Sequence, residues 1–585
     1  MNIFHYFKQE LERIILQLAG NIGVNISDQQ LANFTVEPCR EKKHGDMASN
    51  IAMILCKNFG LKPQELAAKI ISELKNNSNI KSLEIAGAGF INMALQNKIW
   101  YEFLQNLLNQ KQYQLPKIGH GENINVEYAS PNPTGPMHVG HTRGAIYGDV
   151  LANLLAQTGY KITREYYIND AGSQIITLTK SAYLRYLEAL GETIEIPEGL
   201  YPGEYLIPVG QALKEKFGSE LKGKSENEYV PLIRDFVVEE MMKMITSDLA
   251  ALGIKHDNLF SEKKELHDTG KIDAAIKMLE EKGLIYQGTI EAPKGKLPDD
   301  YEEKEQTLFR STLFGDDMDR VVKKSDGTPT YFGGDIAYAL NKFERGAEIM
   351  ILPLGYDHAG YVKRLSAVVS AVSGGKAKVK VILCQMVKFV KNGEPLKMSK
   401  RSGNFITARD VIDEVGSDVI RFIMLSRKND APFDFDLSKV VEQSKDNPIF
   451  YVQYAHARCY SVLRNLKNEM PELNNILNEN PDLEILEKLT DETEIELIQK
   501  LAAYPRTIEM AVTNFEPHRI AFYLQELVAI FHSLWNKGSD NPELKFIVKN
   551  DKNLTKARIF LVIATAKIIA SGLSIFNIKP LEEMR

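Results

Sequence analysis

The stretch from Glu122 to Leu155, ENINVEYASPNPTGPMHVGHTRGAIYGDVLANLL, predicts a strand, a loop and a helix in succession. Apolar side chains alternate over Ile124–Tyr128, as they do in a short strand. Prolines and a glycine interrupt regular structure over residues 131–136. From Thr142 onward apolar residues recur at helical spacing, and Gln157-Thr158-Gly159 provides a stop. We therefore expect this stretch to open an α/β sheet whose ligand binds at the end of a strand.

Two histidines flank a glycine in that loop, in the order His138-Val139-Gly140-His141. A helix start has unpaired N–H groups and a positive dipole end, so it favours an anion. Gly140 allows a nucleotide to approach the backbone closely, and both imidazoles can donate hydrogen bonds to phosphate oxygens. The alternatives are a chance match and a zinc-type pair, although no further Cys or His ligand stands nearby. The four residues alone do not decide between phosphate chemistry and these alternatives.

A basic run stands far downstream, in the segment EPLKMSKRSG at residues 394–403. It follows the apolar run Val381–Cys384 and carries Lys397-Met398-Ser399-Lys400 beside a glycine. Lysine is a mobile point charge on a flexible stem, which suits a loop that closes over a polyphosphate. A solvated, charged surface is the alternative for such a run taken alone.

Taken together, the two motifs resemble the two signatures of class I aminoacyl-tRNA synthetases, in the right order and with room between them for an inserted domain. Three further stretches are similar to the arginyl-tRNA synthetases, bacterial type: EYASPNPTGP at 127–136, YYINDAG at 166–172 and NPIFYVQYAHAR at 447–458. The resemblance covers essentially the whole chain, and several motifs agree. It departs from the family at Val139, where isoleucine is usual, and at Asp418-Val-Ile-Arg421, where Asp-Ala-Leu-Arg is usual.

The resemblance implies a multidomain α/β protein in four parts. Residues 1–115 are expected to form an additional α+β domain that touches the tRNA D-loop. Residues 116–385 are expected to form a Rossmann-like catalytic domain with an inserted connecting domain at about 188–319. Residues 386–445 would hold the lysine signature and a region that contacts the tRNA stem, and 446–585 an all-α anticodon-binding bundle.

Periodicity predicts further elements independently of the resemblance. In the first part we expect helices at Met47–Cys56 and Pro63–Leu74, with a strand and turn over Ser82–Leu95. The sheet of the second part is expected to include Ile162–Tyr167 and to resume with Thr330–Asp335 and Glu348–Leu354. The last part is helical throughout, with helices expected at Phe450–Leu466, Glu492–Leu501, Arg519–Trp535 and Thr555–Leu573.

Composition limits the class of protein. The chain has 585 residues, 44% hydrophobic and 25% charged, which is typical of a soluble protein of three or four domains. No apolar run reaches the length of a membrane span, the N-terminus lacks a signal-peptide pattern, and the four cysteines are scattered. We therefore expect a cytoplasmic protein without a membrane partner. The net charge of −6 is not that of a generic nucleic-acid binder, so a tRNA partner needs local basic strips.

Arginine carries a planar, forked cation, which calls for carboxylates that accept in bidentate fashion. The resemblance implies that Glu127 and Asp335 bind this guanidinium and that Tyr331 lies beside them. It implies that Asn132 holds the α-groups, and the arginine-binding set is completed by Ser130 and His138. The alternatives are that Glu127 ends its strand on a solvated face and that Asp335 caps a helix over Ile336–Phe343.

For ATP, the resemblance implies contacts from both signatures, at His138, Gly140, His141, Lys397, Met398, Ser399 and Lys400. It also implies that the loop Gly355-Tyr-Asp-His358 lies near the adenosine, through Asp357 and His358. Some relatives have a glutamine at the position of Gly355, where it contacts the amino acid, and this chain lacks that side chain.

For tRNA, the family's contact motif Phe-x-Asn matches Phe90 and Asn92, which could stack on a splayed base and hydrogen-bond its edge. The alternative is a plain glycine turn that feeds a strand. Tyr451 and Tyr454 lie three residues apart on one helix face and could stack on anticodon bases, with core packing as the alternative. Trp535 and Met584 are weaker candidates for the same surface.

The mechanism that the resemblance implies has two steps. Arginine first attacks the α-phosphate of Mg²⁺-bound ATP, and the arginyl group then passes to the terminal 2′-OH of tRNA(Arg). His138, His141, Lys397 and Lys400 are the expected catalytic residues, no structural metal is expected, and the family expectation is a monomer that needs tRNA before it activates arginine. Two other functions are possible for such a sequence. One is a nucleotidyltransferase that uses the same His-x-Gly-His chemistry without RNA, although such enzymes are usually much shorter. The other is a tRNA-binding paralogue that has lost catalysis.

Overall fold

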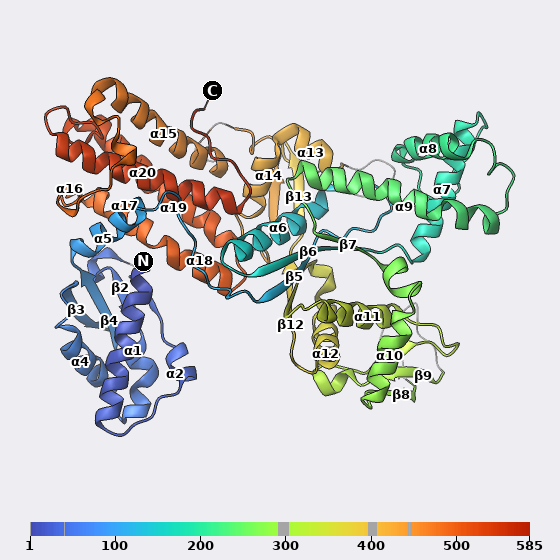
Figure 1. The fold of residues 1–585 in the computed structure, drawn as a ribbon, viewed down its shortest axis with the longest axis horizontal. Coiled ribbons are helices and arrows are strands. Elements are labelled where there is room, and N and C mark those ends of the chain that lie inside the picture. Colours follow the sequence, from blue (N-terminus) through green and yellow to red (C-terminus); the bar gives the residue numbers. More distant parts are fainter. Residues whose placement is uncertain are drawn as a thin grey trace.

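A computed structural model shows an elongated molecule with a central sheet, two extensions on one side of it, and two domains on the other (Figure 1). The structure describes residues 2–39, 41–289, 304–395, 406–442, 444 and 447–584. The four residues Lys397, Met398, Ser399 and Lys400 therefore lie outside the described residues.

The central sheet has five parallel strands in the order β12-β11-β5-β6-β7. Their bounds are β5 Asn123–Glu127, β6 Lys161–Ile168, β7 Asn258–Ser261, β11 Ile349–Gly355 and β12 Lys378–Cys384. The strand order reverses at β5, which lies between β6 and β11, so a switch point stands at the carboxyl end of β5. Ligands of such sheets bind at this point.

Helix α6, Thr142–Gln157, follows β5 as predicted, and it is buried along most of its length. Its end at Gln157 agrees with the predicted stop. Between β10 and β12 the chain forms α11, Tyr331–Glu344, strand β11 and α12, Val362–Ser373.

The prediction of a strand at Thr330–Asp335 is wrong, because α11 already begins at Tyr331. The Thr330 side chain accepts a hydrogen bond from the Gly333 N–H and so caps the helix. Asp335 lies inside the first turns of α11, and the alternative that Asp335 is the cap is therefore also wrong. Tyr331 and Phe332 favour a strand by local propensity, but the cap at Thr330 stabilises the start of a helix instead.

The segment predicted as one insertion, about 188–319, contains a strand of the central sheet, β7. Strand β7 therefore divides the predicted insertion into two extensions, one before β7 and one after it (Figure 1). The first consists of the helices α7 Ser173–Ala189, α8 Ile207–Phe217 and α9 Glu226–Ala251. The second consists of α10 Lys271–Glu281 and an antiparallel sheet of β8 Ile285–Gly288, β9 Gln306–Phe309 and β10 Arg320–Lys323.

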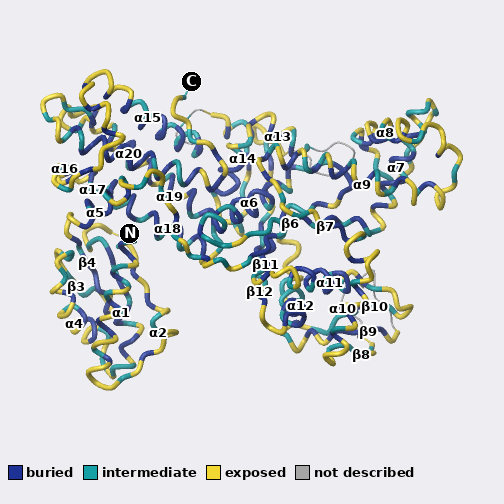
Figure 2. Tube along the Cα trace, in the orientation of Figure 1, coloured by how far each residue is buried: buried dark blue, intermediate teal, exposed yellow. Residues whose placement is uncertain are grey.

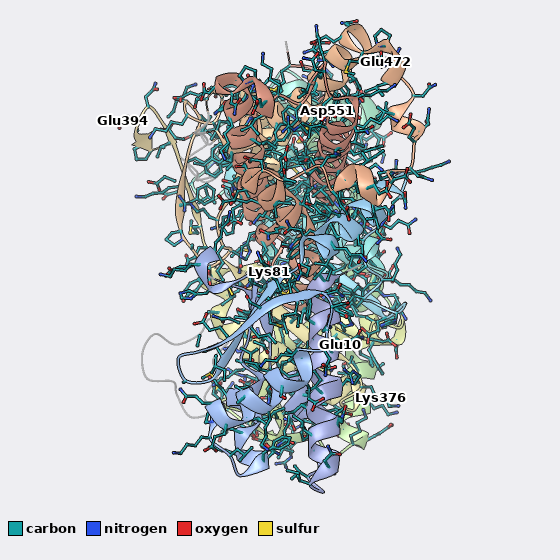
Figure 3. All side chains as sticks on the ribbon, turned by 90° about the vertical axis from the view of Figure 1, so that its left-hand side faces the viewer. Glu10, Lys81, Lys376, Glu394, Glu472 and Asp551 are labelled. Carbon is teal, nitrogen blue, oxygen red and sulfur yellow. The ribbon has the colours of Figure 1, made fainter. Side chains whose placement is uncertain are left out.

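After the central sheet, a small sheet of three strands carries the approach to the lysine signature. Its strands are β13 Val387–Lys391, β14 Glu394–Pro395 and β15 Phe433–Asp436. Glu394 stands at an outer edge of the molecule, two residues before residue 396 (Figure 3). The helices α13 Ala408–Val415 and α14 Ser417–Met424 follow and lead back to the core.

The N-terminal domain is an antiparallel sheet, β1-β2-β4-β3, covered by helices. Its elements are α1 Ile3–Asn21, α2 Asp28–Ala32, β1 Val36–Pro38, β2 Met47–Ser49, α3 Ile51–Leu55, α4 Pro63–Leu74, β3 Ile80–Ala86, β4 Phe90–Leu95 and α5 Asn97–Leu108. The predicted helix Pro63–Leu74 and the strand–turn Ser82–Leu95 are confirmed. The predicted helix Met47–Cys56 is wrong at its start, because Met47–Ser49 pairs with both β1 and β4.

The C-terminal region is a helical bundle, and all four predicted helices are present in it. Its helices are α15 Pro448–Glu469, α16 Leu483–Leu486, α17 Glu492–Ala502, α18 Tyr504–Thr513, α19 His518–Asp540 and α20 Lys552–Ile575. Contrary to our expectation, α20 is long and apolar enough to cross a membrane, with a mean hydropathy of 1.7. Because 72% of that window is buried among the other helices, α20 is the core helix of the bundle (Figure 2).

Candidate active site

The first signature stands at the switch point, between β5 and α6. Residues Val139–His141 form a short 3₁₀ turn that continues directly into α6. The rings of His138 and His141 stack with their centroids 3.6 Å apart, and Gly140 between them is exposed. Two imidazoles and the N–H groups of a helix start thus meet at one place, which is an arrangement suited to a phosphate chain.

The chain that returns from the second signature pairs with the first. The Val139 N–H donates to the Ile406 carbonyl at 3.3 Å, and the Ala408 N–H donates to the Met137 carbonyl at 2.7 Å. His138 and Thr407 form the β-bridge between these two hydrogen bonds. The described residues on the C-terminal side of the lysine signature are therefore fixed against the histidines.

Arg143 holds the start of α6 in place, and the sequence analysis missed it. Its guanidinium is buried and donates to the backbone carbonyls of Gln385, Lys428 and Ala431, at 2.8–2.9 Å. These carbonyls belong to the segments that flank β13 and β15. Its position two residues after His141 was a signal that could have found it.

Three carboxylates gather at the carboxyl end of the sheet. Glu127 ends β5, Asp335 lies on α11, and Glu262 follows β7. Burial, together with the charges of Glu127 and Glu262, raises the pKa of Asp335 to about 7. The raised pKa shows that negative charge is unfavourable here, so this group of Glu127, Glu262 and Asp335, called the pocket below, favours a cation. Sequence reasoning missed Glu262, because we assigned it to an inserted domain.

Glu127 is not on a solvated face: its side chain is 13% exposed and contacts the ammonium of Lys342. Lys342 is 3% exposed and lies over the Tyr338 ring, 4.1 Å from its centroid. Asp335, Tyr338 and Lys342 are spaced as i, i+3 and i+7, so they share one face of α11. That spacing was a signal for Lys342, which the sequence analysis did not use.

Three other residues predicted to bind arginine lie in the loop after β5 and at the start of α11. Ser130 accepts a hydrogen bond from the Tyr167 N–H at 3.0 Å. Asn132 is exposed and donates to the Gln174 side chain at 3.0 Å. Tyr331 stands at the start of α11 with 71% of its surface exposed, which leaves its ring free to cover a bound ligand.

The residues predicted to lie near the adenosine follow β11, which is the neighbour of β5. Asp357 and His358 lie on a 3₁₀ turn, Tyr356–Tyr361, with their side chains 79% and 49% exposed. Their closest charged atoms are 3.6 Å apart. They are thus at the carboxyl end of the sheet, on the opposite side of β5 from β6.

Three of the predicted anticodon contacts form one cluster in the bundle, around Arg458. The Arg458 guanidinium lies over the rings of Tyr454 and Trp535, at 4.2 and 4.7 Å from their centroids. It also donates to the Tyr454 hydroxyl, and the rings of Tyr451 and Tyr454 both lie against His532. The three predicted aromatics are half-buried, so the cluster combines packing with exposed ring surface.

The remaining predicted tRNA contacts differ in exposure. In the N-terminal domain Phe90 is 41% exposed, whereas Asn92 is 6% exposed. Met584 follows a C-terminal segment that binds the face of α15 with Gln453 and His456, which is opposite the face with Tyr454. The structure therefore places Met584 on a different side of α15 from the aromatic cluster.

A parallel sheet with a histidine signature at its switch point, joined to the segment that follows a lysine signature, is the catalytic fold of the class I aminoacyl-tRNA synthetases. The comparisons with known families agree. Residues 2–95 match the arginyl tRNA synthetase N terminal domain, 103–195 the catalytic domain of the class I (R) tRNA synthetases, 337–436 the class I (I, L, M and V) tRNA synthetases, and 452–584 the DALR anticodon binding domain.

The chain belongs to the arginyl-tRNA synthetase family. It is 52% identical to the arginine–tRNA ligase of Rhizobium meliloti and 51% identical to that of Parvibaculum lavamentivorans, in each case over all of both chains. Among solved structures, a putative arginyl-tRNA synthetase from Campylobacter jejuni is 31% identical, with a TM-score of 0.71 over 84% of this chain and 100% of that one. The Thermus thermophilus arginyl-tRNA synthetase, 20% identical, shares the fold with a TM-score of 0.71 over 99% and 100%.

Proposed function

We propose that arginine–tRNA ligation by this chain uses Glu127 and Asp335 to bind the guanidinium of arginine. The observation that carries this proposal is the meeting of these two carboxylates and Glu262 at the end of β5, where Asp335 has a pKa of about 7. A bound guanidinium would add positive charge to this group of carboxylates, which Lys342 and Arg364 offset only in part, and its fork fits bidentate acceptors. Tyr331, Ser130, Asn132 and His138 complete the proposed arginine site.

In the first step the carboxylate oxygen of arginine forms a bond to the α-phosphorus of Mg²⁺-bound ATP. The bond from that phosphorus to the bridging oxygen breaks, and pyrophosphate leaves with the electron pair. His138 and His141 would donate hydrogen bonds to the phosphate oxygens, where negative charge develops. Lys397 and Lys400 would hold the departing pyrophosphate, and Gly140, Asp357, His358, Met398 and Ser399 would complete the ATP site.

In the second step the 2′-OH of the terminal tRNA ribose attacks the carbonyl carbon of the adenylate, and AMP leaves. The tRNA would lie along the molecule, with its anticodon at Tyr451, Tyr454 and Trp535. Phe90 and Asn92 would contact its D-loop and Met584 a neighbouring surface. Monomeric state, cytoplasmic location and a need for tRNA in the first step follow from the family and complete the proposal.

The reaction is tested by exchange of pyrophosphate into ATP with each of the twenty amino acids, with and without total tRNA. We expect exchange with arginine alone, and only when tRNA is present. Exchange with arginine in both conditions would remove the tRNA requirement and leave the ligase intact. Exchange that depends on another amino acid would overturn the proposed pocket.

The pocket is tested by Asp335→Asn, with Asp326→Asn as a matched control on an exposed turn. Because the substituted side chain can no longer pair with the guanidinium of bound arginine, we expect the KM for arginine to rise about 100-fold and the KM for ATP to stay unchanged. The control should behave as the unaltered enzyme. An unchanged arginine KM in Asp335→Asn would remove Asp335 from the pocket.

A further inference from the structure

The most completely buried guanidinium among the described residues belongs to Arg421, outside the site described above. Its side chain is 1% exposed. It forms an ion pair with Asp149 of α6, and it donates to the Phe576 carbonyl at 2.5 Å and to the Leu252 carbonyl at 2.8 Å. The single side chain thus joins α14, α6, α9 and α20, which come from four different parts of the chain.

Both carbonyls belong to helix ends. Leu252 is the residue immediately after α9, and Phe576 is the residue immediately after α20. A helix end carries unpaired carbonyls and a partial negative charge, so a cation between two such ends is favourable. The two ends also touch each other, because the Asn577 side chain donates to the Gly253 carbonyl at 3.1 Å.

Asp149 continues the connection toward the arginine pocket. It accepts a hydrogen bond from the Tyr128 hydroxyl at 3.2 Å, and burial raises the pKa of that hydroxyl, which keeps it protonated. Tyr128 packs directly on α6: a Cβ atom at Gly148 would lie 2.3 Å from the Tyr128 Cβ atom. Tyr128 directly follows Glu127, the last residue of β5, so the contacts of Tyr128 restrain the chain next to Glu127.

We propose that Arg421 is a positioning residue for arginine activation, which holds the pocket end of β5 against the C-terminal helices through Asp149 and Tyr128. The inference rests on the arginine pocket proposed above. It means that the bundle, besides offering a surface to tRNA, fixes the position of a pocket carboxylate. Movement of the end of α20 changes the contacts of Arg421, and through them the place of Glu127.

The test is a KM measurement in pyrophosphate exchange with saturating tRNA, on Arg421→Lys and on a matched control, Arg558→Lys. Arg558 is also buried, pairs with Glu494 and donates to two carbonyls, but all of these contacts lie within the C-terminal region. Lysine keeps the charge and loses the fork. We expect Arg421→Lys to raise the arginine KM about tenfold, a size usual for coupling between sites, and the control to change it less than twofold.

Partial unfolding is distinguished by the pattern of the change. A smaller fraction of folded enzyme lowers the apparent kcat and leaves KM unaltered, and both variants should lower Tm. Equal effects of the two variants on the arginine KM would overturn the proposal. The tRNA Kd of Arg421→Lys should stay within twofold of the unaltered value, and a loss confined to tRNA binding would also overturn it.

A milder variant keeps the proposal testable if Arg421→Lys does not fold. Tyr128→Phe removes a single hydroxyl and should raise the arginine KM by a smaller factor. The double variant with Arg421→Lys and Tyr128→Phe should raise the arginine KM no more than Arg421→Lys alone, because both substitutions break the same connection. Additive increases in KM would contradict the proposal. Asp335→Asn, measured in the same assay, separates the two proposals. An unchanged arginine KM in Asp335→Asn would overturn the proposed pocket. If Asp335→Asn raises the arginine KM and Arg421→Lys does not, only the role of Arg421 is wrong.

Discussion

At the residue scale, the proposed arginine site makes a prediction about pH, because arginine should bind best when Asp335 has lost its proton. Its pKa of about 7 means that a large share of the molecules carry that proton at neutral pH. Arginine brings a permanent cation, so binding favours the ionised carboxylate and releases the proton. Below pH 7 the proton must be removed first, and affinity falls by up to tenfold for each unit.

We therefore expect the KM for arginine to rise between pH 8 and pH 6, and to be nearly constant above pH 8. The measurement is the arginine KM in pyrophosphate exchange across that range, at constant ionic strength. In Asp335→Asn the KM should be high at every pH and the slope should disappear. A slope that persists in this variant would assign the titration to another group.

Lys342 acts on the same pocket from behind Glu127. Its ammonium pairs with Glu127. Burial and the charges of Glu127 and Glu262 raise the pKa of Asp335, and the positive charges of Arg364 and, less strongly, Lys342 oppose this rise. Replacement by methionine leaves Glu127 buried without its cation, which costs on the order of 3–5 kcal/mol. We expect Lys342→Met to lower Tm and to move the pH profile of the arginine KM to higher pH. Lys342→Arg keeps the charge, and a profile shifted as far as that of Lys342→Met would contradict the electrostatic explanation.

At the element scale, the pairing of residues 406–408 with the histidine signature is open to a direct test. Ala408 is the first residue of α13, its N–H donates to the Met137 carbonyl, and Thr407 before it has an extended conformation. Proline is well tolerated at such a position, so Ala408→Pro removes this donor and keeps the helix. We expect kcat for exchange to fall about tenfold through misplacement of the lysine signature, with a small change in Tm.

The control for that variant is Glu492→Pro, at the first residue of α17 in the bundle, far from the site. It should leave the exchange rate unaltered. An Ala408→Pro enzyme with normal kcat would show that the pairing does not position the second signature.

The elements also show what the sequence could predict. Helix α6 and the four predicted helices of the bundle were predictable, because apolar residues recur at helical spacing over several turns, and in α6 and α20 they cover most of the helix surface. Strand β7 was missed because it has four residues and an edge position, which leaves too few alternating side chains to detect. Glu262 was missed because it directly follows β7. Lys342 was missed because its partner, Glu127, is 215 residues away in the sequence.

At the scale of the whole molecule, the aromatic cluster in the bundle and the carboxylate pocket at the sheet belong to different domains (Figure 1). Burial lowers the pKa of His532 to about 4, so its ring is neutral at pH 7 and its Nδ1 can accept from Arg458, 2.9 Å away. Arg458 in turn lies over Tyr454 and Trp535. A positive charge fixed between two rings is a platform on which an unpaired base could stack, as well as a packing device.

Substitution of Tyr454 by alanine separates these two roles. If the ring carries a base, Tyr454→Ala should raise the Kd for tRNA about tenfold or more, since stacking on an aromatic side chain contributes roughly 1–3 kcal/mol per base. At saturating tRNA the arginine KM should then equal that of the unaltered enzyme, because nothing at the sheet has changed. Tyr504→Phe, which removes one hydroxyl contact to Ser571 deep in the same bundle, is the control for packing alone. If Tyr454→Ala lowers Tm but does not change the tRNA Kd, the ring of Tyr454 contributes to packing and does not stack on a base.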